Sequence, residues 1–200
     1  MRIFVTVGNA LQPFDRMLRA VDGALSRHAG AFEGTCQHGT GEVRPHGLRA
    51  VKWLPQAEFE SEMMTADVVV THAGIGSVAT ALKHGHAPIL FVRQGARGEH
   101  VNDHQAELLA ELSSVGRVLS ADTEDSLALM FDAFLRGEHR RHEGGGKVSP
   151  EVLRMIQAAI DARSARSAMA RLRRAGLGLV ASLGPNLRDL LVRGSSESER

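Results

Sequence analysis

The sequence predicts an α/β fold built on a parallel sheet, and three observations support this prediction. Residues 2–7 form a β-branched, apolar run that Gly8 and Asn9 interrupt. Residues 68–70 are three consecutive valines, and apolar residues at helical spacing follow them. An uninterrupted apolar run before a helix is typical of a parallel strand that is covered on both faces. Strand and helix patterns then alternate along the chain, as a sheet with right-handed crossovers requires.

The N-terminal part of the chain is predicted to contain three strands and two helices. Pro13 and Asp15 mark the start of the first helix, which continues to about His28. Pro55 ends the third strand because proline cannot continue a hydrogen-bonded ladder. In chain order, these five elements are expected at residues 2–7, 15–28, 32–37, 48–54 and 56–66.

The central stretch, residues 67–105, is where a ligand is expected to bind. It predicts a buried strand, a glycine turn, a short helix, a second buried strand and then a polar segment rich in Glu, His, Asn and Gln. In parallel sheets, ligands bind beyond the carboxyl ends of the strands. Both strands of this stretch end in loops whose groups can hold an anion or a sugar, and the strand at 2–7 points to the same edge.

Composition excludes several classes of protein. The chain has 200 residues, 43% of them hydrophobic and 24% charged, which is enough for one domain with a core and an appendage. Lys and Arg number 24 against 23 Asp and Glu, and this balance argues against non-specific nucleic-acid binding. Cys36 is the only cysteine, so an internal disulfide is excluded. We find neither a signal peptide nor an apolar run of membrane-spanning length, and therefore expect a cytoplasmic location.

The glycine turn at residues 73–77 follows a strand directly and begins a helix. Glycines allow backbone N–H groups to approach a ligand closely, and the helix dipole favours negative charge there, which predicts a diphosphate site. Alternatively, Gly74 and Gly76 serve only a tight turn. The letters GIGSVA also fit the dinucleotide pattern G-x-G-x-x-A, with Arg93 placed to face a 2′-phosphate. That fingerprint normally follows the first strand of a nucleotide fold, which here ends in VGNALQ.

A second polar cluster, residues 98–105, admits three interpretations. His100 and His104 are one helical turn apart and could share a zinc ion, but position 101 is Val where the H-E-x-x-H motif has Glu. No metal is therefore expected. The cluster could also be the start of a surface helix, with Glu99 near its positive end. Alternatively, so many hydrogen-bonding side chains beside a strand end would suit the recognition of sugar hydroxyls.

Together these residues resemble a known family. The segments THAGIGSVATALKHGHAPILFV and GEHVNDHQ resemble the C-terminal, donor-binding domain of glycosyltransferase family 28. The opening segments IFVTVGN and PFDRMLRAVD are similar to the stand-alone catalytic subunits of two-part UDP-sugar transferases, found in lipid-linked oligosaccharide and exopolysaccharide synthesis. The resemblance covers residues 1–135. It implies a Rossmann-like fold, the donor-binding half of a GT-B glycosyltransferase.

The resemblance also implies roles for individual residues. Relatives bind the nucleotide and its diphosphate at positions that match Gly8, Asn9, His72, Ala73, Gly74, Gly76, Ser77, Thr80 and Arg93. The donor sugar is contacted at positions that match Glu99, His100, Asn102, His104 and Gln105.

Two positions depart from the pattern of the family. Relatives often have Glu in place of Thr80, and a hydroxyl cannot form the bidentate contact that a carboxylate makes with a ribose. Relatives more often have Thr in place of Asn9. The family resemblance therefore leaves the usual ribose contact open in this chain.

The implied activity is an inverting transfer of a hexose or N-acetylhexosamine from a UDP-sugar to a lipid-linked acceptor. Backbone N–H groups, the helix dipole and Arg93 would stabilise the leaving diphosphate, so no cofactor is expected. Two-domain relatives draw the base and the acceptor site largely from an N-terminal domain that has no match here. We therefore expect a membrane-anchored, acceptor-binding partner that holds this chain at the inner face of the membrane. His72 and His100 are the internal candidates for the base.

The C-terminal part is predicted to differ from the domain at residues 1–136. Residues 137–148 have the composition of an exposed linker. Residues 149–194 indicate a helical extension that begins at Ser149 and Pro150 and carries several arginines. This extension could bind a partner or an anionic membrane surface, or pack on its own domain. Residues 195–200 are expected to be disordered.

Two other classes of function remain open on the sequence alone. An NADP-binding oxidoreductase would use Arg93 and the GIGSVA turn to hold a dinucleotide. A non-catalytic regulatory subunit would keep the fold without turning over a donor. The former should bind NADP and ignore UDP, whereas the latter should not support sugar transfer when its partner is added.

Overall fold

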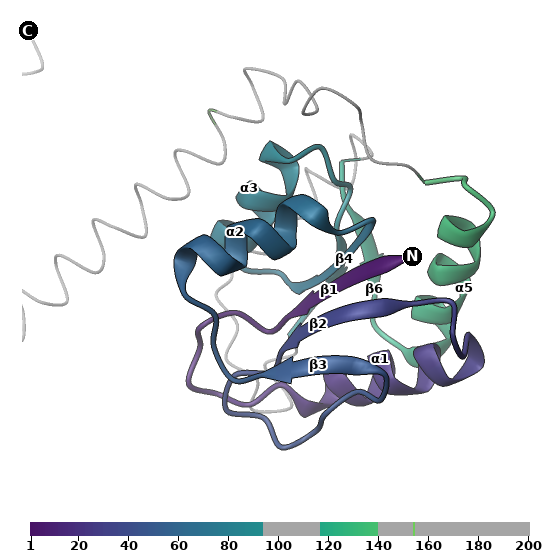
Figure 1. Ribbon diagram of the computed structural model, residues 1–200, viewed down its shortest axis with the longest axis horizontal. Helices are drawn as coiled ribbons and strands as arrows, with labels where there is room; N and C mark the ends of the chain where they lie inside the picture. Colours follow the sequence, from purple (N-terminus) through teal and green to yellow (C-terminus); the bar gives the residue numbers. More distant parts are fainter. Residues whose placement is uncertain (94–116, 140–153, 155–200) are drawn as a thin grey trace, which may run out of the picture. The chain divides into compact units, whose positions relative to one another are not determined.

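The computed structural model describes residues 1–93, 117–139 and 154. The chain divides into two units, Met1–Ala159 and Ile160–Arg200, and every described residue belongs to the first. Six parallel strands form one sheet in the order β3-β2-β1-β4-β5-β6 (Figure 1). These strands are β1 Arg2–Thr6, β2 Glu33–Gln37, β3 Leu48–Val51, β4 Val68–His72, β5 Ile89–Phe91 and β6 Leu119–Ala121.

Four described helices cover the two faces of the sheet. They are α1 Asp15–Arg27, α2 Gln56–Thr65, α3 Ile75–Lys83 and α5 Glu124–Leu135. Successive residues of β1 serve opposite faces, because side chains alternate along a strand. Ile3 and Val5 pack in the cluster that contains α1 and α5, whereas Phe4 packs in the cluster that contains Met63 of α2. Both faces of β1 are therefore buried, as its continuous apolar run predicts.

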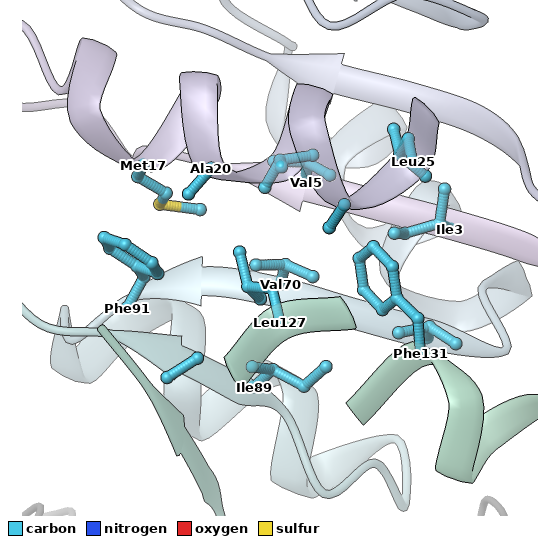
Figure 2. Close-up of a cluster of buried hydrophobic side chains, with 14 of the residues drawn as sticks. Ile3, Val5, Met17, Ala20, Leu25, Val70, Ile89, Phe91, Leu127 and Phe131 are labelled. Atoms are coloured by element: carbon cyan, nitrogen blue, oxygen red, sulfur yellow. The ribbon is translucent and has the colours of Figure 1, made fainter. Parts of the chain in front are cut away.

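The larger core lies between the sheet and the pair α1 and α5 (Figure 2). Met17 and Leu25 of α1 and Phe131 of α5 meet the strand residues Val5 and Ile89 there. Figure 2 shows these side chains interleaved between the helices and the sheet. This core fixes the strands, and so it fixes where their carboxyl ends meet.

The α/β class and the succession of the first five strands along the chain agree with the sequence prediction. One strand was not predicted: β6 has only three residues, and its exposed Ser120 interrupts any apolar pattern. Its identity as a strand comes from pairing with β5, which no local pattern reveals. The third strand ends at Val51 rather than at the predicted residue 54, because its ladder with β2 stops at Gln37.

Several predictions concern parts of the chain that are not described. The C-terminal linker, extension and tail lie outside the described residues, apart from residues 137–139 and 154. Among the helices that the structure does describe, none has the length and apolar character to cross a membrane.

Cys36 is fully buried in β2, and burial raises the pKa of its thiol to about 12. The thiol therefore stays protonated and unreactive at neutral pH.

Candidate functional site

The strand order creates one distinctive position at the carboxyl edge of the sheet. From β1 the chain proceeds outward to β2 and β3, and it then returns to β4 on the other side of β1. The loops after β1 and β4 therefore diverge, and such a switch point is where ligands bind in open α/β sheets. Gly8 and Asn9 follow β1, and Ala73 and Gly74 follow β4. The structure thus brings two separately predicted groups of site residues to one place.

His72, the last residue of β4, occupies the space between two of the predicted glycines. A Cβ added to Gly8 would overlap its ring, and so would a Cβ added to Gly74. Gly8 also has a φ of +74°, a conformation that disfavours side chains. Both glycines therefore have a structural reason: they accommodate the imidazole. The half-buried ring stands at the switch point, with Nδ1 3.4 Å from Thr71 Oγ1.

The N-terminus of α3 lies beside this ring. Gly74 is its N-cap, no side chain caps it, and no acidic residue occupies its first turn. Its first backbone bond within the helix is donated by Val78 to Gly74 O. The N–H groups of Ile75, Gly76 and Ser77 precede that bond, so they are the donors that an α-helix leaves without a helical acceptor.

Gly76 differs from the other two glycines. It is exposed, and a Cβ added there would meet nothing within 4 Å among the described residues. A glycine inside a helix costs roughly 1 kcal/mol relative to alanine. Nothing in the described packing requires this cost. An open surface above three backbone donors is the geometry that a diphosphate needs, because a side chain would keep the anion away from the amides.

Thr80 lies one turn further along α3. Its Oγ1 donates a hydrogen bond of 2.9 Å to Gly76 O, so its only proton is directed back to the helix. The hydroxyl oxygen can still accept a hydrogen bond. In this conformation Thr80 cannot donate a hydrogen bond to a ribose. Thr80 therefore does not replace the carboxylate contact that relatives make with their Glu at this position.

Arg93 follows β5, and its contacts are with the β1–α1 loop. The side chain is 9% exposed, and its guanidinium lies 4.3 Å from the centre of the Phe14 ring. Both Nη1 and Nη2 donate to Gln12 O at 3.3 Å. These contacts tie the loop that carries Gly8 and Asn9 to the end of β5. The predicted role of Arg93 at the diphosphate stays a prediction, since the contacts described here are structural.

A second arginine supports the same loop. Arg16 donates to Val92 O at 2.7 Å and to Asp122 O at 3.2 Å, and its guanidinium lies 4.7 Å from the centre of the Phe91 ring. It thereby joins the start of α1 to the ends of β5 and β6.

The remaining predicted residues, Glu99, His100, Asn102, His104 and Gln105, lie outside the described residues. Their role at the donor sugar stays a prediction.

Two side chains at the end of β2 were missed by the sequence analysis. Gln37 is 1% exposed and donates through Nε2 to Gly8 O and to Asn9 Oδ1. His38 is buried beside it, and this burial, with the nearby charges of Arg44 and Lys52, lowers the pKa of its ring. The only sequence signal for them is their place at the carboxyl end of a strand.

Within the described part of the chain, no three His, Cys, Asp or Glu side chains gather as a metal site would require.

Comparison with solved structures identifies the fold. The glycotransferase of kitacinnamycin matches with a TM-score of 0.51 and 18% identity, over 86% of this chain and 42% of its own. The calicheamicin glycosyltransferase CalG4 matches with a TM-score of 0.51 and 20% identity, over 87% of this chain and 44% of its own. ALG13, known from a solution structure, matches over 76% of this chain and 94% of its own, with 16% identity and a TM-score of 0.49.

The solved structures show the fold of the chain, and the family model shows its family. The chain spans less than half the length of the first two glycosyltransferases, and it shares with them the Rossmann-like fold that the sequence predicts. No curated protein sequence matches the chain. The model of the glycosyltransferase family 28 C-terminal domain matches residues 2–129, a span that contains the complete described sheet and the glycine turn. The chain belongs to the glycosyltransferase family 28 C-terminal domain family.

Proposed function

We propose that the chain binds a UDP-sugar at the switch point and donates its sugar as the catalytic subunit of a hexosyltransferase. The observation that carries this proposal is Gly76, an exposed glycine over the uncapped start of α3 that the described packing does not require. The family match supports a sugar-nucleotide ligand rather than another anion. The UDP-sugar is the substrate, and the proposal needs no cofactor.

The proposed reaction is a displacement at the anomeric carbon of the donor. The acceptor hydroxyl attacks from the face opposite the diphosphate, so the configuration inverts. A base removes the hydroxyl proton, and the bond between the sugar and the diphosphate breaks to release UDP. The three first-turn amides of α3 and the helix dipole would stabilise the charge that develops on the departing diphosphate. His72, which stands beside Gly74, is the described candidate for the base.

A partner is proposed because the family model that matches describes a C-terminal domain rather than a whole glycosyltransferase. The matched span is 42% and 44% of the two larger glycosyltransferases. We propose that a second, membrane-anchored chain supplies the acceptor-binding half and a lipid-linked saccharide acceptor. The purified chain alone should then fail to glycosylate such an acceptor, and adding the partner should restore turnover. Full turnover by the chain alone would contradict this part of the proposal.

Calorimetric titration with UDP tests the central proposal, with NADP as the competing ligand. Gly76→Val adds an isopropyl group where the fold leaves open space, so it should abolish UDP binding without changing the thermal midpoint. Ala57→Val is a matched control, because Ala57 is the exposed second residue of α2 as Gly76 is of α3. The control should bind UDP as the wild type does. Binding of NADP but not UDP would overturn the proposal and favour a dinucleotide enzyme.

A further inference from the structure

The side chain of Gln37 links the end of β2 to the loop after β1. It is buried beneath that loop, and its Nε2 lies 3.3 Å from Gly8 O and 3.1 Å from Asn9 Oδ1. Thr6 supports the same turn, since its Oγ1 accepts a hydrogen bond of 3.1 Å from Gly8 N. The turn that carries Asn9 is therefore held from below by two buried polar side chains of neighbouring strands.

These contacts determine the orientation of both amides. A backbone carbonyl only accepts hydrogen bonds, so the group of Gln37 that faces Gly8 O must be its NH₂. That NH₂ has a second proton, and Asn9 must present its oxygen to receive it. With Oδ1 directed to Gln37, the NH₂ of Asn9 is left for the exposed side of the loop. Asn9 itself is exposed, next to Gly8, which packs against His72 at the switch point.

We infer that Gln37 is a positioning residue, which orients Asn9 so that its Nδ2 donates a hydrogen bond to the bound UDP. This inference rests on the proposed function, because it takes UDP as the ligand. A buried residue of β2 would thus add a side-chain donor to the backbone donors that α3 contributes from the other side of the switch point. Gln37 itself does not touch the ligand.

The fold gives a reason for a donor at this position, because Gln37 Nε2 satisfies the buried Gly8 O. Gln37 Oε1 is buried as well, and it accepts no hydrogen bond from the described residues. Gln37→Met removes this acceptor together with the two hydrogen bonds, and it leaves Gly8 O without the donor of Gln37. Gln37→Met should therefore lower the thermal midpoint, and its UDP affinity is measured well below that midpoint, where the protein is folded. A purely structural role predicts no effect of this variant on UDP binding, whereas a positioning role predicts weaker binding.

Gln37→Glu tests the orientation directly, because its carboxylate can only accept hydrogen bonds. When ionised, this side chain should attract the NH₂ of Asn9 and turn its oxygen to the ligand. When protonated, it regains one donor and should restore the original orientation. We expect the affinity for UDP, as a ratio to the wild type at the same pH, to fall about tenfold above the pKa of the new carboxyl and to recover below it. Taking the ratio cancels the protonation of UDP itself.

The orientation of Asn9 is also measurable without a ligand. In ¹H–¹⁵N spectra, the side-chain NH₂ of Asn9 should shift with pH by more in Gln37→Glu than in the wild type, where His38 and His72 also lie near this loop, with Asn9→Ser identifying the resonance. If the wild type failed to bind UDP, the proposed function would be wrong, while a shift in these spectra would still confirm the orientation. If UDP binds and Gln37→Glu and Gln37→Met both match the wild type at every pH, the inference is overturned.

Discussion

The N-termini of α3 and α5 solve the same structural problem in opposite ways. Both helices follow a strand of the same parallel sheet, and both leave backbone N–H groups without helical acceptors. In α5 a capping box satisfies one of them: Ser126 N donates to Thr123 Oγ1, and in return Thr123 N donates to Ser126 Oγ, both at 3.1 Å. Two acidic residues, Glu124 and Asp125, also occupy its first turn. In α3 none of these features is present.

The start of α5 is built for stability, whereas the start of α3 is left open for a ligand. A capping residue contributes about 1 kcal/mol, and α3 is built without that contribution. Its stability comes instead from burial of Ile75, Val78 and Leu82 against the sheet. Because the start of α3 has neither a side-chain cap nor an acidic residue in its first turn, its backbone N–H groups stay available for an anion. The start of α5, above the edge strand β6, is closed to one.

The largest expected effect comes from giving α3 the acidic first turn of α5. Gly76→Asp would place a carboxylate where we propose the diphosphate binds. Repulsion between the two should lower the affinity for UDP about 100-fold or more, ~2.8 kcal/mol. The free energy of unfolding should not fall, since an acidic residue is favourable at a helix N-terminus. Calorimetry and urea unfolding measure the two quantities, and unchanged affinity would remove Gly76 from the site.

The next effect comes from opening the start of α5. Thr123→Ala removes the hydroxyl that accepts from Ser126 N, and it should lower the free energy of unfolding by about 1 kcal/mol. The affinity for UDP should not change. Thr123→Ser, which keeps the hydroxyl, is the control and should unfold like the wild type. A loss of UDP affinity in Thr123→Ala would mean that the two helix starts are not independent.

A smaller effect concerns the contact between α1 and α5. Burial alone would lower the pKa of His28, but hydrogen bonds to Ala24 O and Asp132, and the charge of Asp132, outweigh it and raise the pKa. A raised pKa means that protonation stabilises the folded state. That stabilisation is complete below the usual pKa of 6.5 and is lost as the pH rises through the raised value.

Urea unfolding on either side of this pH range measures the loss. His28→Gln can still form hydrogen bonds but does not titrate, so its stability should depend less on pH than that of the wild type. Equal pH dependence in the two proteins would contradict this account of His28. UDP binding, which we place at α3, should not follow this titration.

The smallest effect comes from comparing two glycines inside helices. A Cβ at Gly23 of α1 would overlap the carboxylate of Glu124, the end of a flexible side chain that is 42% exposed. Gly23→Ala should therefore change the free energy of unfolding by no more than about 0.5 kcal/mol, because the gain in helix propensity offsets that displacement. A Cβ at Gly76 meets nothing among the described residues, so Gly76→Ala should raise the free energy of unfolding by up to about 1 kcal/mol, but it should weaken UDP binding several-fold. Equal UDP affinity in both variants would argue against close approach of a ligand at Gly76.

Local patterns were sufficient to predict most of the fold. The apolar runs before Gly8 and at residues 68–70 predicted buried parallel strands because burial on both faces leaves a continuous apolar signal. They did not predict β6, whose three residues carry no such signal. The glycine turn was found from its residue types. Its location opposite Gly8 follows from the strand order, which depends on pairing between distant segments.

The supporting residues of the site could not be predicted for the same reason. Gln37 belongs to a strand whose letters, EGTCQ, give no indication of a contact with Asn9. Likewise, Arg93 was predicted to face an anion, and its contact with Gln12 O depends on a neighbour 81 residues earlier in the chain. Side-chain partners across a sheet are set by tertiary packing, so sequence identifies candidates at a strand end without assigning their contacts.

The most direct test of the contrast between the two helix starts is a ¹H–¹⁵N titration of the full chain with UDP. The account predicts that the amide resonances of Ile75, Gly76 and Ser77 shift together and saturate with the calorimetric affinity. The amide resonances of Glu124, Asp125 and Ser126 should not shift, because Thr123 Oγ1 already accepts from Ser126 N and the carboxylates of Glu124 and Asp125 repel an anion there. Saturable shifts at the start of α5 with none at the start of α3 would contradict the account.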